Sequence, residues 1–211
     1  MSAKVVDKKE KKDKIIGAAI RVFAQKGFAK TTINDIAHAS GIGKGTVYEY
    51  FSNKEEIINH SFSFFIRALE LDFQEVLIME IPAKEKLTRI LDGFAQFLDA
   101  ETTGLMELMF DFWSEGIKNK KSKGLLFDEM KKFYHSYREI FADIIIEGMT
   151  DGSFKKNINP RGIGSMIVGT LDGILVQWIL DKSSIDYGEM VHTVKNTVLH
   201  GIAAAGESTN D

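Results

Sequence analysis

The scarcity of proline is the feature that most limits the folds open to this chain. Only two prolines occur among 211 residues, and long stretches between them consist of residues that favour helices. Strand-rich folds are usually punctuated by clusters of proline and glycine, so this pattern predicts helices joined by short turns. We therefore expect an all-α protein, and 44% hydrophobic residues are enough for a substantial core.

Apolar residues recur with the helical period along most of the sequence and predict about nine helices. Four begin in the first sixty residues, at about 10–26, 33–40, 44–51 and after Ser52. Beyond residue 80 we expect helices at about 83–100, 105–117, 122–150, 160–182 and 187–205. Four starts carry capping signals, namely Thr32 with Asp35, Ser52 with Glu55, Asn159 before Pro160, and Asp186 with Glu189.

Positive charge is concentrated near the N-terminus. Residues 1–60 hold 11 Lys and Arg against 7 Asp and Glu, whereas the whole chain has a net charge of −3. A basic end on an acidic body is what attraction to phosphate at one end requires. The lysine-rich start, about residues 1–9, is predicted to be disordered.

Cysteine is absent, which excludes disulfides and thiolate-ligated metals and suits the cytoplasm. The lysine-rich start is not followed by an apolar stretch of signal-peptide length, so we expect a cytoplasmic protein. Residues 163–180 are mostly apolar, but Asp172 and Gln177 lie among them. A charged residue within a membrane span is costly, so this segment is predicted to be a buried helix and no membrane partner is expected.

The helices at 10–26, 33–40 and 44–51 are predicted to form a helix-turn-helix. Glycines at both ends of the segment 41–43 permit the tight turn between the last two. Val47 and Phe51 lie one turn apart and are expected to pack against the preceding helix. The opposite face then points outward, and it consists of Lys44, Gly45, Thr46, Tyr48 and Glu49.

This outward face suits nucleic acid. Lysine supplies charge for phosphate, threonine offers a hydroxyl or methyl group to a base edge, and the tyrosine hydroxyl donates to phosphate oxygens. The helix start at Asn53 and Lys54 also predicts an anion site. Three-helix units of this kind serve as packing modules as well, and the pattern alone leaves that alternative open.

Residues 31–37 (TTINDIA), 41–51 (GIGKGTVYEYF) and 53–56 (NKEE) resemble the signature of the tetracycline-repressor (TetR) family. The resemblance covers about residues 10–58. It implies a homodimeric, ligand-responsive repressor that binds a palindromic DNA operator, with a ligand that alters the distance between two recognition helices. It also implies a DNA-binding domain at 1–52 and a ligand-binding and dimerisation domain at 53–211.

The resemblance assigns roles to individual residues of the DNA-binding domain. It implies that Thr32 contacts a phosphate, and that Tyr50 and Lys54 contact the DNA backbone. The residues that it places in the major groove are Lys44, Gly45, Thr46 and Tyr48. Glu49 is not a usual phosphate partner.

Aromatic and methionine residues are frequent between about 83 and 150. An ordinary core explains such stripes, but flexible methionines among large rings also suit a pocket, and the resemblance implies one here. The effector is then a small apolar or aromatic molecule. The candidate ligand-binding residues are Phe94, Met109, Phe110, Trp113, Tyr134, Tyr137 and Phe141.

Small residues leave one face of the 160–182 helix nearly bare. The resemblance implies that this helix and the last one pair across a twofold axis into a four-helix bundle. Packing within the chain is the alternative. The candidate interface residues are Gly169, Gly173, Val176, Val191, Val194, Val198 and Ile202.

Enzymatic sites are not indicated. Glu107, Asp111 and Glu115 share one helical face, but a solvated stripe explains them better than a metal site does. We find neither a phosphate-binding glycine loop nor a nucleophile elbow, and predict no catalytic residue, metal or cofactor. Two rivals remain: a DNA-binding protein that senses no ligand, and an enzyme or carrier in the helical body.

Overall fold

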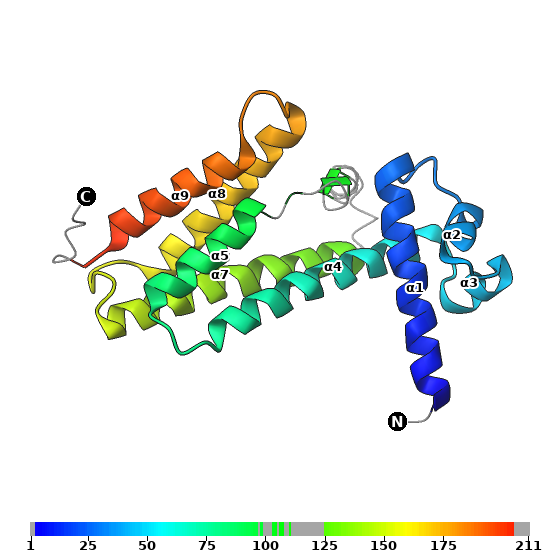
Figure 1. Ribbon diagram of the computed structural model, residues 1–211, viewed down its shortest axis with the longest axis horizontal. Helices are drawn as coiled ribbons and strands as arrows, with labels where there is room; N and C mark the ends of the chain where they lie inside the picture. The colour runs from blue at the N-terminus through cyan, green and yellow to red at the C-terminus, as the bar shows by residue number, and fades with distance from the viewer. Residues whose placement is uncertain are drawn as a thin grey trace. The chain divides into compact units, whose positions relative to one another are not determined.

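The computed structural model describes residues 3–96, 98, 103, 104, 106, 107, 110 and 125–204. Its helices are α1 (Ala3–Lys26), α2 (Ile33–Ser40), α3 (Lys44–Tyr50), α4 (Lys54–Leu77), α5 (Ala83–Gln96), α7 (Leu125–Asp151), α8 (Pro160–Leu180) and α9 (Tyr187–Ile202) (Figure 1). Within these ranges the only β pairing is an isolated bridge between Phe154 and Ala203. The all-α prediction is confirmed, while the helix expected at 105–117 lies largely outside the described residues.

The chain forms two compact units. The N-terminal unit comprises residues 1–69 and 98–129, and the second unit comprises residues 70–97 and 130–211. Helix α4 contributes to both, because the division falls after Leu69.

In the N-terminal unit, α1, α2, α3 and the start of α4 surround one apolar core (Figure 1). The predicted anchoring of α3 is confirmed, since Val47 and Phe51 share this core with Ile36 and Ala37. The other buried members are Ile15, Ile16, Ala19, Phe23, Ile57 and Ile58.

Helix α1 begins at Ala3 rather than at about residue 10. It therefore includes most of the lysine-rich start for which disorder was predicted. Lysine and glutamate favour helix, and adding a residue to an existing helix is far easier than starting one. Such an extension needs no apolar stripe, so the hydrophobic period did not reveal it.

Three of the four predicted helix caps are confirmed, at Thr32, Asn159 and Asp186. The fourth differs by one residue. The side-chain oxygen of Asn53, not of Ser52, accepts the N–H of Glu56 at 2.7 Å, while the Ser52 N–H donates to the Glu56 carboxylate at 2.7 Å. The amide of Asn53 thus performs the role expected of the serine hydroxyl.

In the second unit, α9 packs against both α5 and α8 (Figure 1). Lys86 of α5 is only 6% exposed, and its Nζ donates to both carboxylate oxygens of Glu147 and to the Leu77 carbonyl at 2.8–3.0 Å. Asp151 accepts the N–H of Ala83 at 3.1 Å, at the start of α5. Because a buried ammonium is tolerated only when it is paired, these bonds fix α5 against the end of α7.

Candidate nucleic-acid interface

Helix α3 presents a polar face on a fixed apolar base. Gly41 ends α2 in the left-handed conformation (φ 64°), and the N–H of Ile42 donates to the Ala37 carbonyl at 3.1 Å, which completes the turn. Val47 is completely buried and Phe51 is 1% exposed. These contacts determine which side of α3 faces solvent.

The residues predicted to point outward do so in most cases. Lys44, Gly45, Tyr48 and Glu49 are exposed, whereas Thr46 and Tyr50 are partly buried. Half of the Tyr48 surface is accessible. A Cβ added at Gly45 would meet no heavy atom within 4 Å, so a large ligand can approach the backbone there. The face offers a cation and hydroxyl groups to a polyanion.

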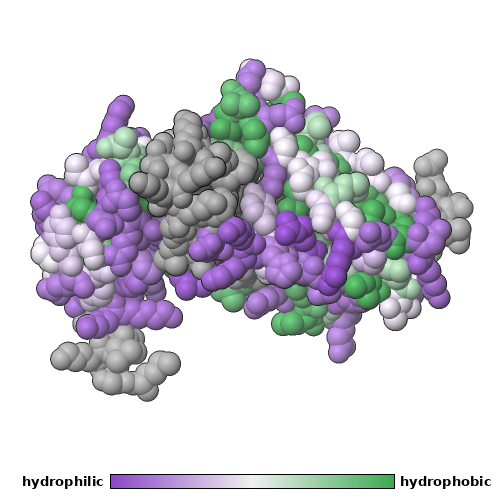
Figure 2. All heavy atoms as spheres, turned by 180° about the vertical axis from the view of Figure 1, so that it is seen from behind, coloured by the Kyte–Doolittle hydropathy of each residue, from purple (hydrophilic) through white to green (hydrophobic). Residues whose placement is uncertain are grey.

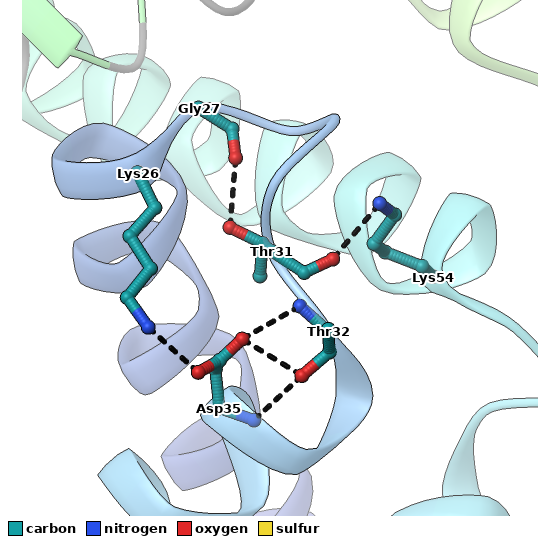
Figure 3. Close-up of polar contacts among 6 residues, drawn as sticks. All are labelled: Lys26, Gly27, Thr31, Thr32, Asp35 and Lys54. Carbon is teal, nitrogen blue, oxygen red and sulfur yellow. Dashed lines mark hydrogen bonds and ion pairs between the residues drawn. The ribbon is translucent and has the colours of Figure 1, made fainter.

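Thr32 caps α2 with a closed set of bonds (Figure 3). Its hydroxyl accepts the Asp35 N–H at 3.2 Å and donates to the Asp35 carboxylate at 2.7 Å, which also accepts the Thr32 N–H at 2.9 Å. Lys26 pairs with the same carboxylate at 2.6 Å. The bond from Lys26, followed by those from Thr32, holds the pKa of Asp35 well below its usual range.

Lys54 does not extend freely toward solvent. Its Nζ donates to the Thr31 carbonyl at 2.9 Å (Figure 3). It also donates to the Phe28 carbonyl at 2.6 Å and lies 3.5 Å from that of Ala29. It also lies 4.2 Å from the centroid of the Phe28 ring. Lys54 was predicted to contact the DNA backbone, but in this structure its ammonium group is bonded to the turn between α1 and α2.

The start of α4 was predicted to be an anion site, but its own side chains occupy it. Asn53 accepts the N–H of Glu56, and the Glu56 carboxylate accepts the N–H of Ser52. The bond from Ser52 lowers the pKa of Glu56, which keeps a negative charge at this position. A phosphate would meet that charge, which opposes binding of an anion at this helix start, and the anion site there stays a prediction.

Two family descriptions match this chain. Residues 15–60 match "Bacterial regulatory proteins, tetR family", and residues 116–201 match "YsiA-like protein, C-terminal region". The chain belongs to the TetR family of transcriptional regulators. The resemblance inferred from the α2 to α4 residues is thus confirmed.

Relatives of this TetR-family regulator align over most of its length. The fatty acid metabolism regulator protein of Bacillus subtilis is 26% identical over 199 residues, covering 92% of this chain and 97% of the relative. The repressor KstR2 of Rhodococcus jostii is 21% identical over 197 residues, covering 93% of each.

Solved structures of two regulators also align with this chain over most of its length. The regulator FadR from B. subtilis, in complex with stearoyl-CoA, has a TM-score of 0.66 and 27% identity, covering 90% of this chain and 98% of FadR. A TetR regulator from Haloarcula marismortui has a TM-score of 0.79 at 15% identity, covering 92% and 99%, and supports the fold alone. The protein is a ligand-responsive transcriptional repressor.

The predicted ligand-binding residues of this repressor fall into three groups. Phe94, Tyr137, Phe141 and Tyr134 lie in the second unit. Phe110 is partly buried and belongs to the N-terminal unit. The remaining two, Met109 and Trp113, lie outside the described residues.

The rings of the second unit form an aromatic cluster. The Phe94 centroid lies 6.0 Å from that of Tyr137 and 6.5 Å from that of Phe141. Phe133 lies 4.0 Å from Tyr137, and Phe73 of α4 lies 5.0 Å from Tyr137. We define the aromatic cluster as Phe73, Phe94, Phe133, Tyr134, Tyr137 and Phe141.

Sequence reasoning missed Phe73, which is 7% exposed. It follows the buried Phe62 by eleven residues, which is three helical turns, so both lie on one face of α4. That spacing was a signal that could have identified it.

A buried carboxyl group lies beside the aromatic cluster. Burial raises the pKa of Asp172 on α8 to about 6, although a hydrogen bond from Tyr134 opposes this effect. Burial, with the nearby Asp172, also raises the pKa of Tyr187 to about 12. Among the described residues, no three His, Asp or Glu side chains are grouped so as to hold a metal ion.

The predicted interface residues differ between the last two helices. On α8, Gly169 is exposed and Gly173 and Val176 are partly buried, and a Cβ added at either glycine would meet nothing within 4 Å. On α9, the predicted positions are mostly covered by the protein's own core: Val191 is 0%, Val198 4% and Ile202 3% exposed, and only Val194 is partly exposed. Three of the four predicted α9 positions are therefore covered within the protomer, and only Val194 stays available to a partner.

Proposed function

We propose that this repressor binds a palindromic operator as a homodimer in the cytoplasm and releases it when an effector binds. Residues 1–52 supply the DNA contacts, and residues 53–211 bind the effector and dimerise. Lys44, Gly45, Thr46 and Tyr48 enter the major groove, and Thr32 and Tyr50 contact the backbone.

The observation that carries the DNA assignment is the polar face of α3. Val47 and Phe51 are fixed in the core, so Lys44 and Tyr48 are held on the solvent side of a rigid helix. Recognition helices that enter a major groove use such a face. The excess of positive charge in residues 1–60 adds attraction to phosphate.

The homodimer proposal rests on α8. This helix is long and apolar enough to cross a membrane by length and composition alone, yet only 28% of its most apolar window is buried in the protomer. Gly169 and Gly173 leave room for close approach of another helix. We propose a second copy of the chain as the occupant, because Asp172, midway along the same helix, opposes insertion into lipid.

In the proposed homodimer, the separation of the two recognition helices determines which DNA sites can be bound. For one turn of DNA this separation is roughly 34–36 Å, and the operator is then a palindrome. An effector that prefers a dimer with another spacing shifts the population away from the DNA-binding form.

We propose an effector with a long apolar chain, of the acyl thioester class. The aromatic cluster in the second unit supplies apolar contact area, and FadR of B. subtilis is a relative solved with stearoyl-CoA. In the present structure these rings pack on one another, so the effector takes over contacts that the rings now make among themselves.

The test of DNA binding starts from duplexes that the wild-type protein selects from a random pool. Lys44→Ala and Tyr48→Ala should each weaken binding to the selected duplex at least about tenfold. Lys156→Ala removes the same charge from an exposed site of the second unit and should leave binding unchanged. A selected duplex that binds all four proteins equally would refute the α3 assignment.

Two further measurements test the dimer and the effector. In sedimentation, the wild type should be a dimer and Gly173→Leu a monomer, while Gly93→Leu, at an exposed α5 position, should remain dimeric. The effector class is tested by release of bound DNA. Stearoyl-CoA should release the selected duplex from the wild-type protein, whereas coenzyme A alone should not. Full affinity in saturating stearoyl-CoA would rule out this effector class.

A further inference from the structure

The ammonium group of Lys54 is fully used inside the protein. An ammonium has three N–H donors, and three carbonyl oxygens surround this one, those of Phe28, Ala29 and Thr31 at 2.6, 3.5 and 2.9 Å. The side chain is partly buried at the first residue of α4. To contact a DNA phosphate, it would have to give up bonds that it already makes.

The carbonyls belong to a tight turn between α1 and α2, at residues 28–31, which we call the 28–31 turn. Gly27 ends α1 in the left-handed conformation (φ 72°), and its carbonyl accepts the Thr31 hydroxyl at 2.7 Å (Figure 3). Thr31 is 2% exposed, and its N–H donates to the Phe28 carbonyl at 3.2 Å. Carbonyl dipoles that converge in this way repel one another, and a cation at their focus offsets the repulsion.

This turn leads directly into the capped start of α2. Thr31 is followed by Thr32, whose capping box with Asp35 begins the helix, and Lys26 holds Asp35 from α1. Helix α2 packs in turn against α3. The turn therefore determines where α2 begins, and α2 supports the recognition helix.

We propose that Lys54 is a positioning residue for DNA recognition, acting through the 28–31 turn and not by contact with a phosphate. The proposal rests on the proposed role of α3 in the major groove. It replaces the backbone contact that the family resemblance implies for this residue. The two roles differ in measurable ways, because a phosphate contact contributes to the salt dependence of binding and a positioning residue does not.

The test uses the full-length protein and the duplex selected by the wild type, with Lys54→Met, Lys54→Arg and Lys44→Ala. Binding to the selected duplex and to a scrambled one is measured across a salt series. Lys44→Ala should lower the slope of log affinity against log salt by about 0.9 for each phosphate that the variant no longer neutralises. Lys54→Met should leave that slope unchanged and weaken selected-duplex binding about tenfold, with little change for the scrambled duplex.

The arginine variant distinguishes the roles without removing charge. Arginine binds phosphate at least as well as lysine, but its planar guanidinium does not match a cup of carbonyls built around a compact ammonium. Lys54→Arg should therefore also lose selectivity. Retained selectivity with Lys54→Arg, or a reduced salt slope with Lys54→Met, would overturn the proposal.

Thr31→Val provides a second approach if Lys54→Met does not fold. It removes the hydroxyl bond to Gly27 and leaves Lys54 in place, so it should reduce selectivity at an unchanged salt slope.

Hydrogen exchange of wild type and Lys54→Arg gives a readout that needs no DNA, with faster exchange expected at residues 31–40 of the variant. Unchanged exchange there would also overturn the proposal. Failure of the wild type to select any duplex would count against DNA recognition by α3 and would leave the exchange result to decide the role of Lys54.

Discussion

The two units of this repressor differ in where their proposed functional side chains lie. In the N-terminal unit the proposed binding groups lie outside a small core, on α3, and hydrophilic residues predominate on the face of this unit that Figure 2 shows. In the second unit the aromatic cluster and Asp172 are buried or partly buried, while hydrophobic side chains such as Met166 and Leu180 are exposed. DNA needs an external face, whereas an apolar effector and a helical partner need apolar surface.

The largest expected effect on stability comes from Gly164, a glycine on the side of α8 that packs against α7. A Cβ at Gly164 would lie 2.7 Å from the Arg138 carbonyl oxygen and 3.2 Å from the Ala142 nitrogen, both of them backbone atoms that cannot turn aside. Gly164→Ala should therefore lower the free energy of unfolding by about 3 kcal/mol, measured by urea denaturation.

The matched control for that variant is Gly93→Ala, in α5. A Cβ there meets nothing within 4 Å, so alanine should stabilise the helix by about 0.5–1 kcal/mol. Equal effects of the two substitutions would contradict the close approach of α7 and α8.

The buried carboxyl of the second unit gives a pH-dependent effect. The pKa of Asp172 is raised from 3.8 to about 6, so its contribution to stability is full below pH 4 and is lost as pH rises through 6. Tyr134 and Tyr187 are the titratable groups that act on it, and both remain neutral in this range. The free energy of unfolding of Asp172→Asn, relative to wild type, should rise by on the order of 2 kcal/mol between pH 4 and pH 8.

Tyr134→Phe serves as the companion to that variant. It removes the hydroxyl that opposes the shift, so ionisation of Asp172 becomes more costly and the pH dependence of stability should be steeper than in wild type. A flat difference between Asp172→Asn and wild type would show that the carboxyl is solvated.

Gly45 separates folding from recognition in the N-terminal unit. A Cβ there meets nothing within 4 Å, so Gly45→Ala should stabilise the fold by up to about 1 kcal/mol. If the backbone of α3 approaches DNA closely, the same methyl group should weaken binding to the selected duplex about tenfold. Thermal unfolding and duplex titration should therefore move in opposite directions, and tighter binding would remove Gly45 from the groove.

The sequence predicted helices and caps well because their signals are local. Thr32, Asn159 and Asp186 each bond to a backbone N–H three residues away, and such bonds need no tertiary contact. Long-range partners were not predictable in this way. The bond from Lys54 to Phe28 spans 26 residues, and the burial of Val191 depends on how α9 packs against the rest of the second unit.

The same limit applies to the burial of α9. An apolar stripe at Val191, Val194 and Val198 shows that the helix covers something, but not whether its own chain or a partner lies there. On α8 the exposed or partly buried glycines, Gly169 and Gly173, leave room beside the helix, and a partner there stays a proposal.

The smallest effect concerns the capped start of α2. The bonds that Asp35 accepts from Lys26 and Thr32 depress its pKa, so the stability they supply is present at neutral pH and is lost as pH falls below 3.8, its unperturbed value. Asp35→Asn should lower the melting temperature slightly at pH 7 and less at pH 3. Lys26→Met should give a similar loss, and the double variant little more, because both single changes break the same ion pair. If the losses of melting temperature from the two single variants add up in the double variant, Asp35 stabilises α2 through its cap bonds alone and not through Lys26. The start of α2 would then depend on the 28–31 turn more than on the ion pair to α1.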